Sequence, residues 1–237
     1  MHSYAVDLHI HTALSPCGEE EMTPNNIVNM AAIKGLDIIA VTDHNAIGNV
    51  QPCIEAGKKL NMVVVPGIEI TTQEEVHLLA YFDSYQLLEE FYCTLKSNQM
   101  GLRNRPEIFG KQLLFDSKDV IIGEEELLLM NALQISFDDT VRLIHQFGGA
   151  AVPAHINRSS FSVMSSLGFL PTHLPIGCVE LFNGTEKELF LSRHPEYKKY
   201  RHIISSDAHC LANIMERIFF VELSSLTASS LIQWLKI

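Results

Sequence analysis

Short hydrophobic runs rich in Val and Ile recur along the chain, and most of the stretches between them have helical periodicity. Runs that are nearly unbroken by polar residues are typical of strands buried on both faces of a sheet. Strands that alternate with helices favour parallel pairing through βαβ units. The pattern predicts strands at about Tyr4–His9, Asp37–Thr42, Met62–Ile70, Val76–Phe82, Gly149–Ala154, Gly177–Asn183, His202–Ser206 and Phe219–Leu223.

Capping residues mark the boundaries of the predicted helices. Thr23 is placed as an N-cap, Pro24 as the first helical residue and Gly35 as the residue after the last turn, which together predict a helix between the first two strands. Ser136, followed by two aspartates, opens another helix that a glycine pair closes. A last helix is expected over Thr227–Ile237, packed on the outside of the domain.

Residues 84–135 interrupt this alternation. They contain a predicted helix near Gln86–Ser97, a hairpin formed by Lys111–Asp116 and Asp119–Gly123, and a further helix after Glu124. The segment has too few apolar residues for a hydrophobic core of its own. We therefore expect an insertion that forms a lid or wall over one face, not a second domain.

Length and composition agree with one α/β domain over residues 1–237, of which 47% are hydrophobic. The strands could form an open sheet or close into a barrel. No run approaches the roughly 18 apolar residues of a membrane span, and the N-terminus lacks the features of a signal peptide. Five cysteines without a CxxC pair argue against a disulfide framework. We expect a cytoplasmic protein that does not bind membranes.

The balance of charge restricts the partners. There are 28 acidic residues against 17 Lys and Arg, a formal net charge of −11. Such an excess argues against non-specific binding to duplex DNA, so duplex nucleic acid is not expected as a partner. Aromatic platforms of the kind that stack on single strands are not evident either. A cationic metal centre could still attract a phosphate to an acidic protein, because the charge at the site is local.

Histidine and acidic residues stand at the ends of the predicted strands. In a parallel barrel the C-terminal ends of the strands meet at one mouth, where functional sites are built. His77 departs from this rule because it opens its strand, so the preceding turn, residues 71–75, would have to fold back over the mouth. The residues at strand ends are His9, His11, Asp43, His44, Glu69, His77, His155, Asp207 and His209.

The spacing of these residues suits metal binding. Residues i and i+2 of a strand point to one side, so His9 and His11 can reach a single ion, and Asp207 with His209 repeats the geometry. Each motif alone could instead be surface histidines or a helix N-cap, but their recurrence at successive strand ends favours a metal site. The number of ligands exceeds one tetrahedral ion. This excess of ligands indicates two or three ions. The mix of nitrogen and oxygen donors favours Zn, Mn or Fe, with Zn expected first.

The motifs DLHIHT, TDHN, PGIE, VPAH and SSDAH, in this order, resemble those of the PHP (polymerase and histidinol phosphatase) superfamily, in its stand-alone phosphoesterase branch. The resemblance covers nearly the whole chain. It implies a distorted (β/α)7 TIM-like barrel, with the inserted segment over its mouth, and the hydrolysis of phosphate esters at a centre of two or three metal ions.

The resemblance also implies a set of ligands. One ion would be held by His9, His11, Glu69 and Asp207; Glu69 would bridge to a second ion held by His77 and His155; and His44 and His209 would hold a third. Many members have an aspartate five residues after the second histidine of the HxH pair, where this chain has Pro16. Either Cys17 or Glu19 supplies that ligand, or the third site is weak. A Cys17 thiolate would favour Zn.

Three further roles follow from position and chemistry. Arg158, three residues after His155, could make a bidentate contact with a phosphate or be a solvated loop arginine; Arg217 is a weaker candidate. His209 or Asp43 could protonate the leaving alkoxide, although a metal ligand does so with difficulty. Asp43 could instead orient His44.

The leading hypothesis is a phosphatase or phosphodiesterase that uses metal-activated hydroxide on a small phosphorylated metabolite, a nucleotide or the end of a short oligonucleotide. An amidohydrolase-like metal hydrolase is an alternative, weakened because no lysine stands at the end of a middle strand. A non-catalytic metal-binding regulatory module is another, supported only by Pro16. The choice between monoester and diester and the oligomeric state stay open.

Overall fold

A computed structural model of the chain describes residues 1–182 and 187–236. Its centre is a six-stranded sheet with the strand order β10-β1-β2-β3-β4-β7. Every strand expected from the hydrophobic pattern is present, and only Asn183 of the predicted strand residues lies outside the described ranges. The strands of this sheet are β1 (His2–Ile10), β2 (Ile38–Val41), β3 (Val63–Thr71), β4 (His77–Tyr81), β7 (Ala150–Pro153) and β10 (Phe220–Leu223).

A second sheet continues the curvature of the first. β8 (Cys178–Phe182) and β9 (Arg201–Ser205) pair in parallel, with β8 next to β7 and β9 next to β1. A single bridge between Ile10 and Ala208 joins this end of the chain to β1. The result is a curled half-barrel, so the mixed α/β class is confirmed. The regular (β/α)7 repeat of parallel strands is not observed, because β4 and β10 run antiparallel to their neighbours.

The reversal at β4 comes from a tight turn. The N–H of Thr72 donates to the carbonyl of Val76, and Glu75 takes a positive φ of 58°. A turn this short can join only antiparallel strands, because a parallel pair needs a crossover of a dozen or more residues. The start of β4 therefore lies beside the end of β3, with His77 opposite Thr71. This turn brings His77 to the mouth of the half-barrel.

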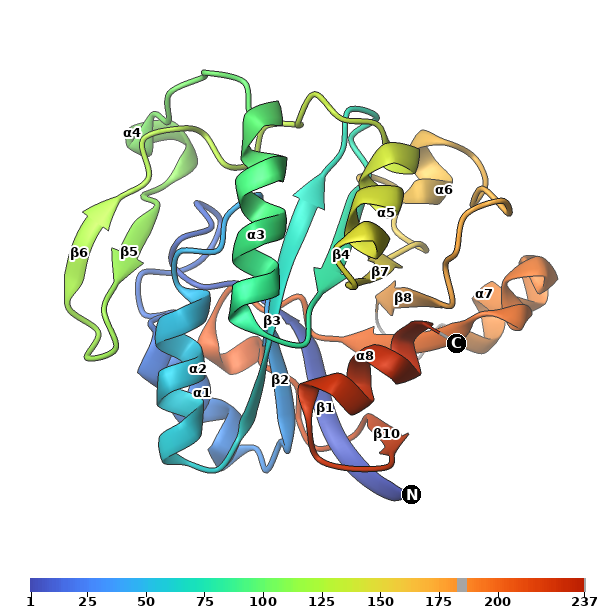
Figure 1. Ribbon diagram of the computed structural model, residues 1–237, viewed down its shortest axis with the longest axis horizontal. Coiled ribbons are helices and arrows are strands. Elements are labelled where there is room, and N and C mark those ends of the chain that lie inside the picture. The colour runs from blue at the N-terminus through green and yellow to red at the C-terminus, as the bar shows by residue number, and fades with distance from the viewer. Residues whose placement is uncertain (183–186, 237) are drawn as a thin grey trace.

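Helices cover the outside of the curled sheet (Figure 1), and their predicted caps are confirmed. Thr23 caps α1 by accepting from the N–H of Asn26, and Ser136 caps α5 by accepting from the N–H of Asp139. Ile237, in the predicted last helix, lies outside the described residues. No helix within the described ranges combines the length and apolar character needed to cross a membrane. The helices named here are α1 (Pro24–Ile33), α2 (Val50–Lys59), α3 (Tyr85–Leu95), α4 (Pro106–Phe109), α5 (Phe137–Gln146), α6 (Val163–Ser166), α7 (Lys187–Arg193) and α8 (Ala228–Lys236).

Residues 84–135 contain the expected helix, α3, and the expected hairpin, formed by β5 (Leu113–Phe115) and β6 (Ile121–Glu124). The hairpin lies at the edge of the molecule away from α7 (Figure 1). It packs against the loops after β1 and β2, where Leu114 contacts an apolar cluster of Leu14, Ala46 and Leu129.

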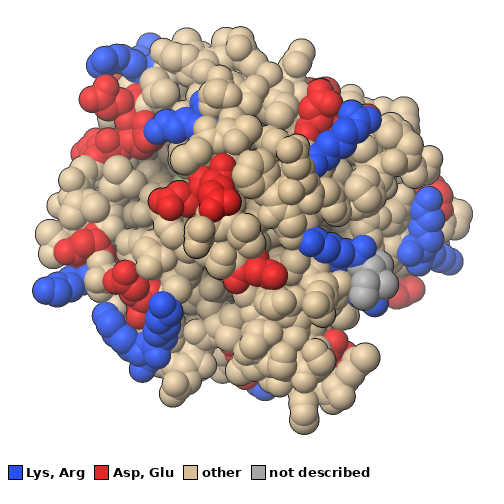
Figure 2. Space-filling view, viewed as in Figure 1, with Lys and Arg blue, Asp and Glu red and all other residues tan. Residues whose placement is uncertain are grey.

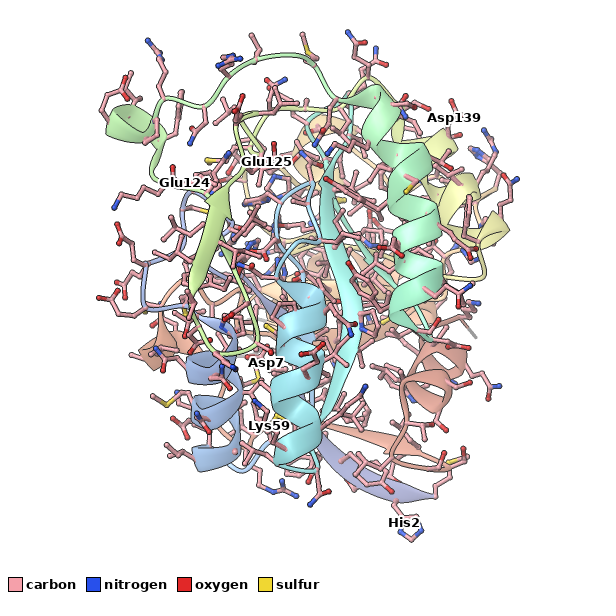
Figure 3. All side chains as sticks on the ribbon, turned by 60° about the vertical axis from the view of Figure 1, so that its left-hand side comes forward. His2, Asp7, Lys59, Glu124, Glu125 and Asp139 are labelled. Atoms are coloured by element: carbon pink, nitrogen blue, oxygen red, sulfur yellow. The ribbon has the colours of Figure 1, made fainter. Side chains whose placement is uncertain are left out.

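The predicted helix after Glu124 is wrong. Figure 3 shows Glu124 and Glu125 at the end of β6, and beyond them the chain runs through a bridge and turns. The side chain of Gln112, fully buried, donates to the carbonyls of Glu125 and Leu127 and accepts from the N–H of Leu129. These bonds take backbone groups that a helix would pair internally, so tertiary contacts override the local pattern.

Gln112 therefore offers a test of what holds this segment. The substitution Gln112→Ala removes three hydrogen bonds to the backbone of residues 125–129 and should lower the free energy of unfolding by about 2–3 kcal/mol. Urea denaturation followed by circular dichroism measures it. The exposed Gln86→Ala is the control and should change stability by less than about 0.5 kcal/mol. Equal effects of the two substitutions would show that Gln112 is not the anchor.

Candidate metal centre

Six histidines and two carboxylates from different strand ends meet at the mouth of the half-barrel. His9 is on β1, Glu69 on β3 and His77 at the start of β4; the others follow strands directly. Most of them are withdrawn from solvent: His9 and His11 are fully buried and Glu69 is 1% exposed. The side chains that the fold brings together are His9, His11, His44, Glu69, His77, His155, Asp207 and His209.

Four of these side chains have the spacing of ligands around a single ion. The Nε2 atoms of His9 and His11 are 3.1 Å apart, and each lies 3.2–3.3 Å from a carboxylate oxygen of Glu69 and of Asp207. A tetrahedral ion with bonds of 2.0–2.1 Å separates its ligand atoms by about 3.3 Å. The geometry fits a metal ion of this kind.

Glu69 is the centre of the cluster. Its Oε1 faces His9, His77 and His155, and its Oε2 faces His11 and His44, at 3.0–3.4 Å. Neither oxygen has a hydrogen-bond partner among the described residues. A buried carboxylate without partners is costly. A cation between Glu69 and the surrounding imidazoles removes that cost, so the residues present fit the metal centre.

A third group of possible ligands lies beside the first. The ligand atoms of His11, His44 and His209 lie within 4.8 Å of one another, and the ring of His209 stacks on that of His11 at 4.3 Å. The Cys17 thiol is within hydrogen-bonding reach of His44 but is exposed and outside the group of three. The structure therefore supplies three histidines at the site where the expected aspartate is replaced by Pro16.

Glu180, on β8, was missed by the sequence analysis. It is 2% exposed. Its carboxylate accepts from His9 Nδ1 at 3.0 Å and from the backbone N–H of His155 at 2.9 Å. It therefore holds His9 in the tautomer whose Nε2 faces the cluster, which is how metal-binding histidines are commonly oriented. The available signal was an acidic residue inside an otherwise apolar strand, Cys-Val-Glu-Leu-Phe.

Asp43 forms hydrogen bonds with Thr12 and Ser15. It is fully buried, but its carboxylate accepts from Thr12 N, Thr12 Oγ1 and Ser15 Oγ at 2.7 Å. The Ser15 hydroxyl donates its single hydrogen bond to Asp43. Ser15 Oγ can therefore only accept from His11, so His11 Nδ1 is the donor, at 2.9 Å. Asp43 thus positions His11 through Ser15, and Ser15 also accepts from the N–H of His44.

Arg158 lies at the edge of the cluster, and Arg217 does not. Arg158 Nη1 donates to Asp207 Oδ2 at 2.6 Å, and its guanidinium lies 3.9 Å from the ring centre of Phe182. Both line a cavity of about 570 Å³ that also includes Asp207 and His209. Arg217 instead forms an ion pair with Asp37, the residue immediately before β2.

The charges in the cluster shift one another's pKa values. Burial raises the pKa of Glu69, but His77, His9 and His44 outweigh it and hold that pKa well below its usual range. Burial lowers the pKa of His11, yet the contacts with Asp207 and Glu69 raise it to about 9. For His209, burial and the neighbouring His11 lower the pKa to about 3. His209 is therefore neutral at pH 7, the form in which an imidazole binds a metal ion.

Strained backbone coincides with the site. Asn45, His155 and Asp207 have positive φ angles of 48°, 29° and 50°, a region that residues other than glycine occupy at a cost. Asn45 also donates to the carbonyls of Leu129 and Asn131. The inserted segment is thereby tied to the loop that carries His44.

A half-barrel whose mouth gathers histidines and carboxylates is an arrangement suited to holding metal ions. Comparison with known families is more specific. Residues 7–172, more than half of the chain, match the family described as PHP domain. The chain belongs to this family.

Two curated relatives match parts of the chain. The DNA polymerase III PolC-type of Bacillus cereus is 33% identical over 99 residues, covering 41% of this chain and 7% of the relative. The 5'-3' exoribonuclease Rnm of Escherichia coli is 29% identical over 121 residues, covering 47% of this chain and 39% of the relative. The chain spans less than half the length of both.

Solved structures share the fold across the chain. Endonuclease Q of Pyrococcus furiosus has a TM-score of 0.73 at 17% identity, covering 99% of this chain and 56% of that one. A proposed metal-dependent phosphoesterase of Bifidobacterium adolescentis has a TM-score of 0.61 at 18% identity, covering 98% and 96%.

One expectation about partners is wrong. Duplex nucleic acid was excluded on net charge, yet endonuclease Q, with a TM-score of 0.72 to this chain, was solved with a 27-mer duplex substrate that has an abasic lesion at the active site. Net charge averages over the whole surface, whereas binding depends on local charge. Lys and Arg on the face in Figure 2 are dispersed among acidic residues.

Glu180 should control metal affinity. Glu180→Gln keeps the size of the side chain but removes the charge that faces His9, and should weaken zinc binding about 10- to 100-fold, measured by competition with a chromophoric chelator. The control is Glu222→Gln, exposed on β10, which should bind zinc as the wild type does. Unchanged affinity in Glu180→Gln would contradict the orienting role.

Metal uptake should release protons. His11 and His44, each with a pKa raised to about 9, carry protons at pH 7 that an ion must displace. Apparent zinc affinity should therefore rise from pH 6.5 to 8.5, by about tenfold per pH unit for each proton displaced. Calorimetric titrations in buffers of different ionisation enthalpy count the protons. An affinity independent of pH would contradict this assignment.

Proposed function

We propose that this chain is a metal-dependent phosphoesterase that hydrolyses a phosphate ester of a nucleotide or nucleic acid. The observation that carries the proposal is Glu69, whose two buried and otherwise unpartnered oxygens face five imidazoles. This is the arrangement expected of a carboxylate that bridges two cations. A small phosphorylated metabolite is the alternative substrate.

The proposed ligand sets follow the contacts. Glu69 is shared between the first two sets, and His11 lies between the first and the third. Divalent ions held there would supply hydroxide near neutral pH and withdraw charge from a phosphate. We expect Zn first, then Mn or Fe, because the ligands mix nitrogen and oxygen. The sets are His9, His11, Glu69 and Asp207 for one ion, Glu69, His77 and His155 for a second, and His44 and His209 beside His11 for a third, with Cys17 as an additional candidate.

The remaining candidates take supporting roles in this proposal. Arg158 is assigned to phosphate binding, because its guanidinium reaches from Phe182 to Asp207 along the cavity wall. Asp43 is a positioning residue for His11, not a proton donor. Residues 84–135 are proposed to form a wall beside the mouth within one domain over residues 1–237, since Asn45 ties them to the site loop.

Nucleic acid is favoured over a metabolite by a combination of features. The cavity of about 570 Å³ is large enough for a nucleotide. The proteins that this chain is similar to include a polymerase, an exoribonuclease and an endonuclease. The cluster contacts described above involve no lysine, which continues to weaken the amidohydrolase alternative.

The first experiment combines metal analysis with hydrolysis assays. Protein purified without chelator should contain two to three equivalents of Zn, Mn or Fe by plasma mass spectrometry. It should hydrolyse p-nitrophenyl phosphate or its bis ester, and His9→Ala should abolish turnover. Less than one equivalent and no turnover after addition of Zn or Mn would overturn the catalytic proposal in favour of a binding module.

Arg158 provides a sharper test of phosphate binding. Arg158→Ala should raise KM about 10- to 100-fold, because a charge-assisted contact is lost, while metal content stays the same. Arg142→Ala, on the exposed face of α5, is the control and should leave KM unchanged. A fall in kcat with no change in KM would show that Arg158 acts other than by binding substrate.

A further inference from the structure

Phe161 is an exposed aromatic residue that borders the metal centre. It is 45% exposed, and its ring stacks on that of His77 with centroids 4.9 Å apart and an angle of 20° between the planes. An apolar ring left this open to solvent gains less from burial than one in the core. The Phe161 ring thus packs on His77, a candidate metal ligand, and keeps part of its surface open to solvent.

The backbone holds Phe161 in this position. Phe161 has a positive φ of 53°, which is unfavourable for an aromatic residue and persists only where neighbouring contacts maintain it. Its carbonyl accepts from the N–H of His77 at 2.9 Å. The same loop is closed by Ser162 Oγ, which donates to the carbonyl of Arg158 at 2.7 Å. The ring is therefore presented at the mouth by a fixed loop.

A second partly exposed aromatic residue lies near the cluster, beside Arg158. Phe182, 37% exposed, lies beneath the guanidinium of Arg158. The Asn157 side chain donates to the carbonyl of Phe182 and accepts from its N–H, both at 2.8 Å. Phe161 borders the cluster at His77, whereas Arg158 and Phe182 border it at Asp207. The cluster is therefore bordered by one aromatic residue at His77 and by a second near Asp207.

We propose that Phe161 is a specificity-determining residue that stacks on the base of the nucleotide whose phosphate lies at the metal centre. The inference rests on the proposed phosphoesterase function and specifies its substrate class: phosphate esters with an accessible, unpaired nucleobase. Every base has a flat π face, so such stacking is tolerant of sequence. Periodicity in the sequence does not point to this ring, because Phe161 lies on a loop.

A matched pair of ligands tests the proposal. The 5′-phosphonate analogues of adenosine 5′-monophosphate and ribose 5-phosphate, in which a methylene group replaces the ester oxygen, cannot be hydrolysed. They share the ribose and differ at C1′, where only the first carries a base, and calorimetry with zinc-loaded protein measures their affinities. Wild-type protein should bind the nucleotide about 5- to 100-fold more tightly, the range that stacking on one base provides. Phe161→Leu should remove this preference by weakening only the nucleotide, and Phe161→Tyr should retain it.

Controls separate stacking from a structural role. Metal content and thermal unfolding of Phe161→Leu should match the wild type, because the ring is half-exposed. Phe169→Leu, at a position 65% exposed on another loop, should bind both ligands as the wild type does.

The outcomes distinguish the two proposals. Equal wild-type affinity for both ligands, or an equal loss of both in Phe161→Leu, would overturn the stacking proposal while hydrolysis of phosphate esters stands. If neither ligand binds and no ester is hydrolysed, the phosphoesterase proposal fails and the stacking proposal fails with it.

Discussion

Burial of the Glu69 carboxylate is the constraint on which the rest of the site depends. A charged group withdrawn from water needs compensation by opposite charge or by hydrogen bonds. Five imidazoles face the two oxygens of Glu69, and within residues 1–182 and 187–236 neither oxygen accepts a hydrogen bond. The outer contacts are organised around this need: Glu180 orients His9, and Asp43, through Ser15, orients His11. Both rings therefore turn Nε2 inward.

Much of the architecture can be predicted because its signals are local. Buried strands, the caps at Thr23 and Ser136, and the i, i+2 spacing of His9 and His11 each depend on neighbouring residues. The failures have long-range causes. The helix expected after Glu124 yields to hydrogen bonds from Gln112. Glu180 is far from His9 in sequence. Its role is therefore recognised only in the folded chain, where β8 lies beside β7 and the Glu180 carboxylate meets His9.

The direction of β4 is an intermediate case. The sequence shows that His77 opens a strand. In an all-parallel sheet, the start of that strand would lie at the end of the sheet opposite the mouth, away from the other candidate ligands. The five-residue connection between β3 and β4 contains enough information to predict the hairpin, because a parallel crossover cannot be that short. Net charge was a poorer guide, since it describes the whole molecule and takes no account of how Arg158 and the cluster are placed.

The order of the ligands along the chain has a consequence for assembly. His9 to His77 come from the first third of the chain, and their strands are neighbours in one sheet, so these side chains can meet early in folding. His155 follows β7, which pairs with β4, and Asp207 and His209 follow β9, which contacts β1. These contacts close longer loops, which is entropically slower. Ions at this mouth would join the two portions as cross-links do, so that removing them would loosen the closure of the half-barrel before it disturbed the β1–β4 sheet.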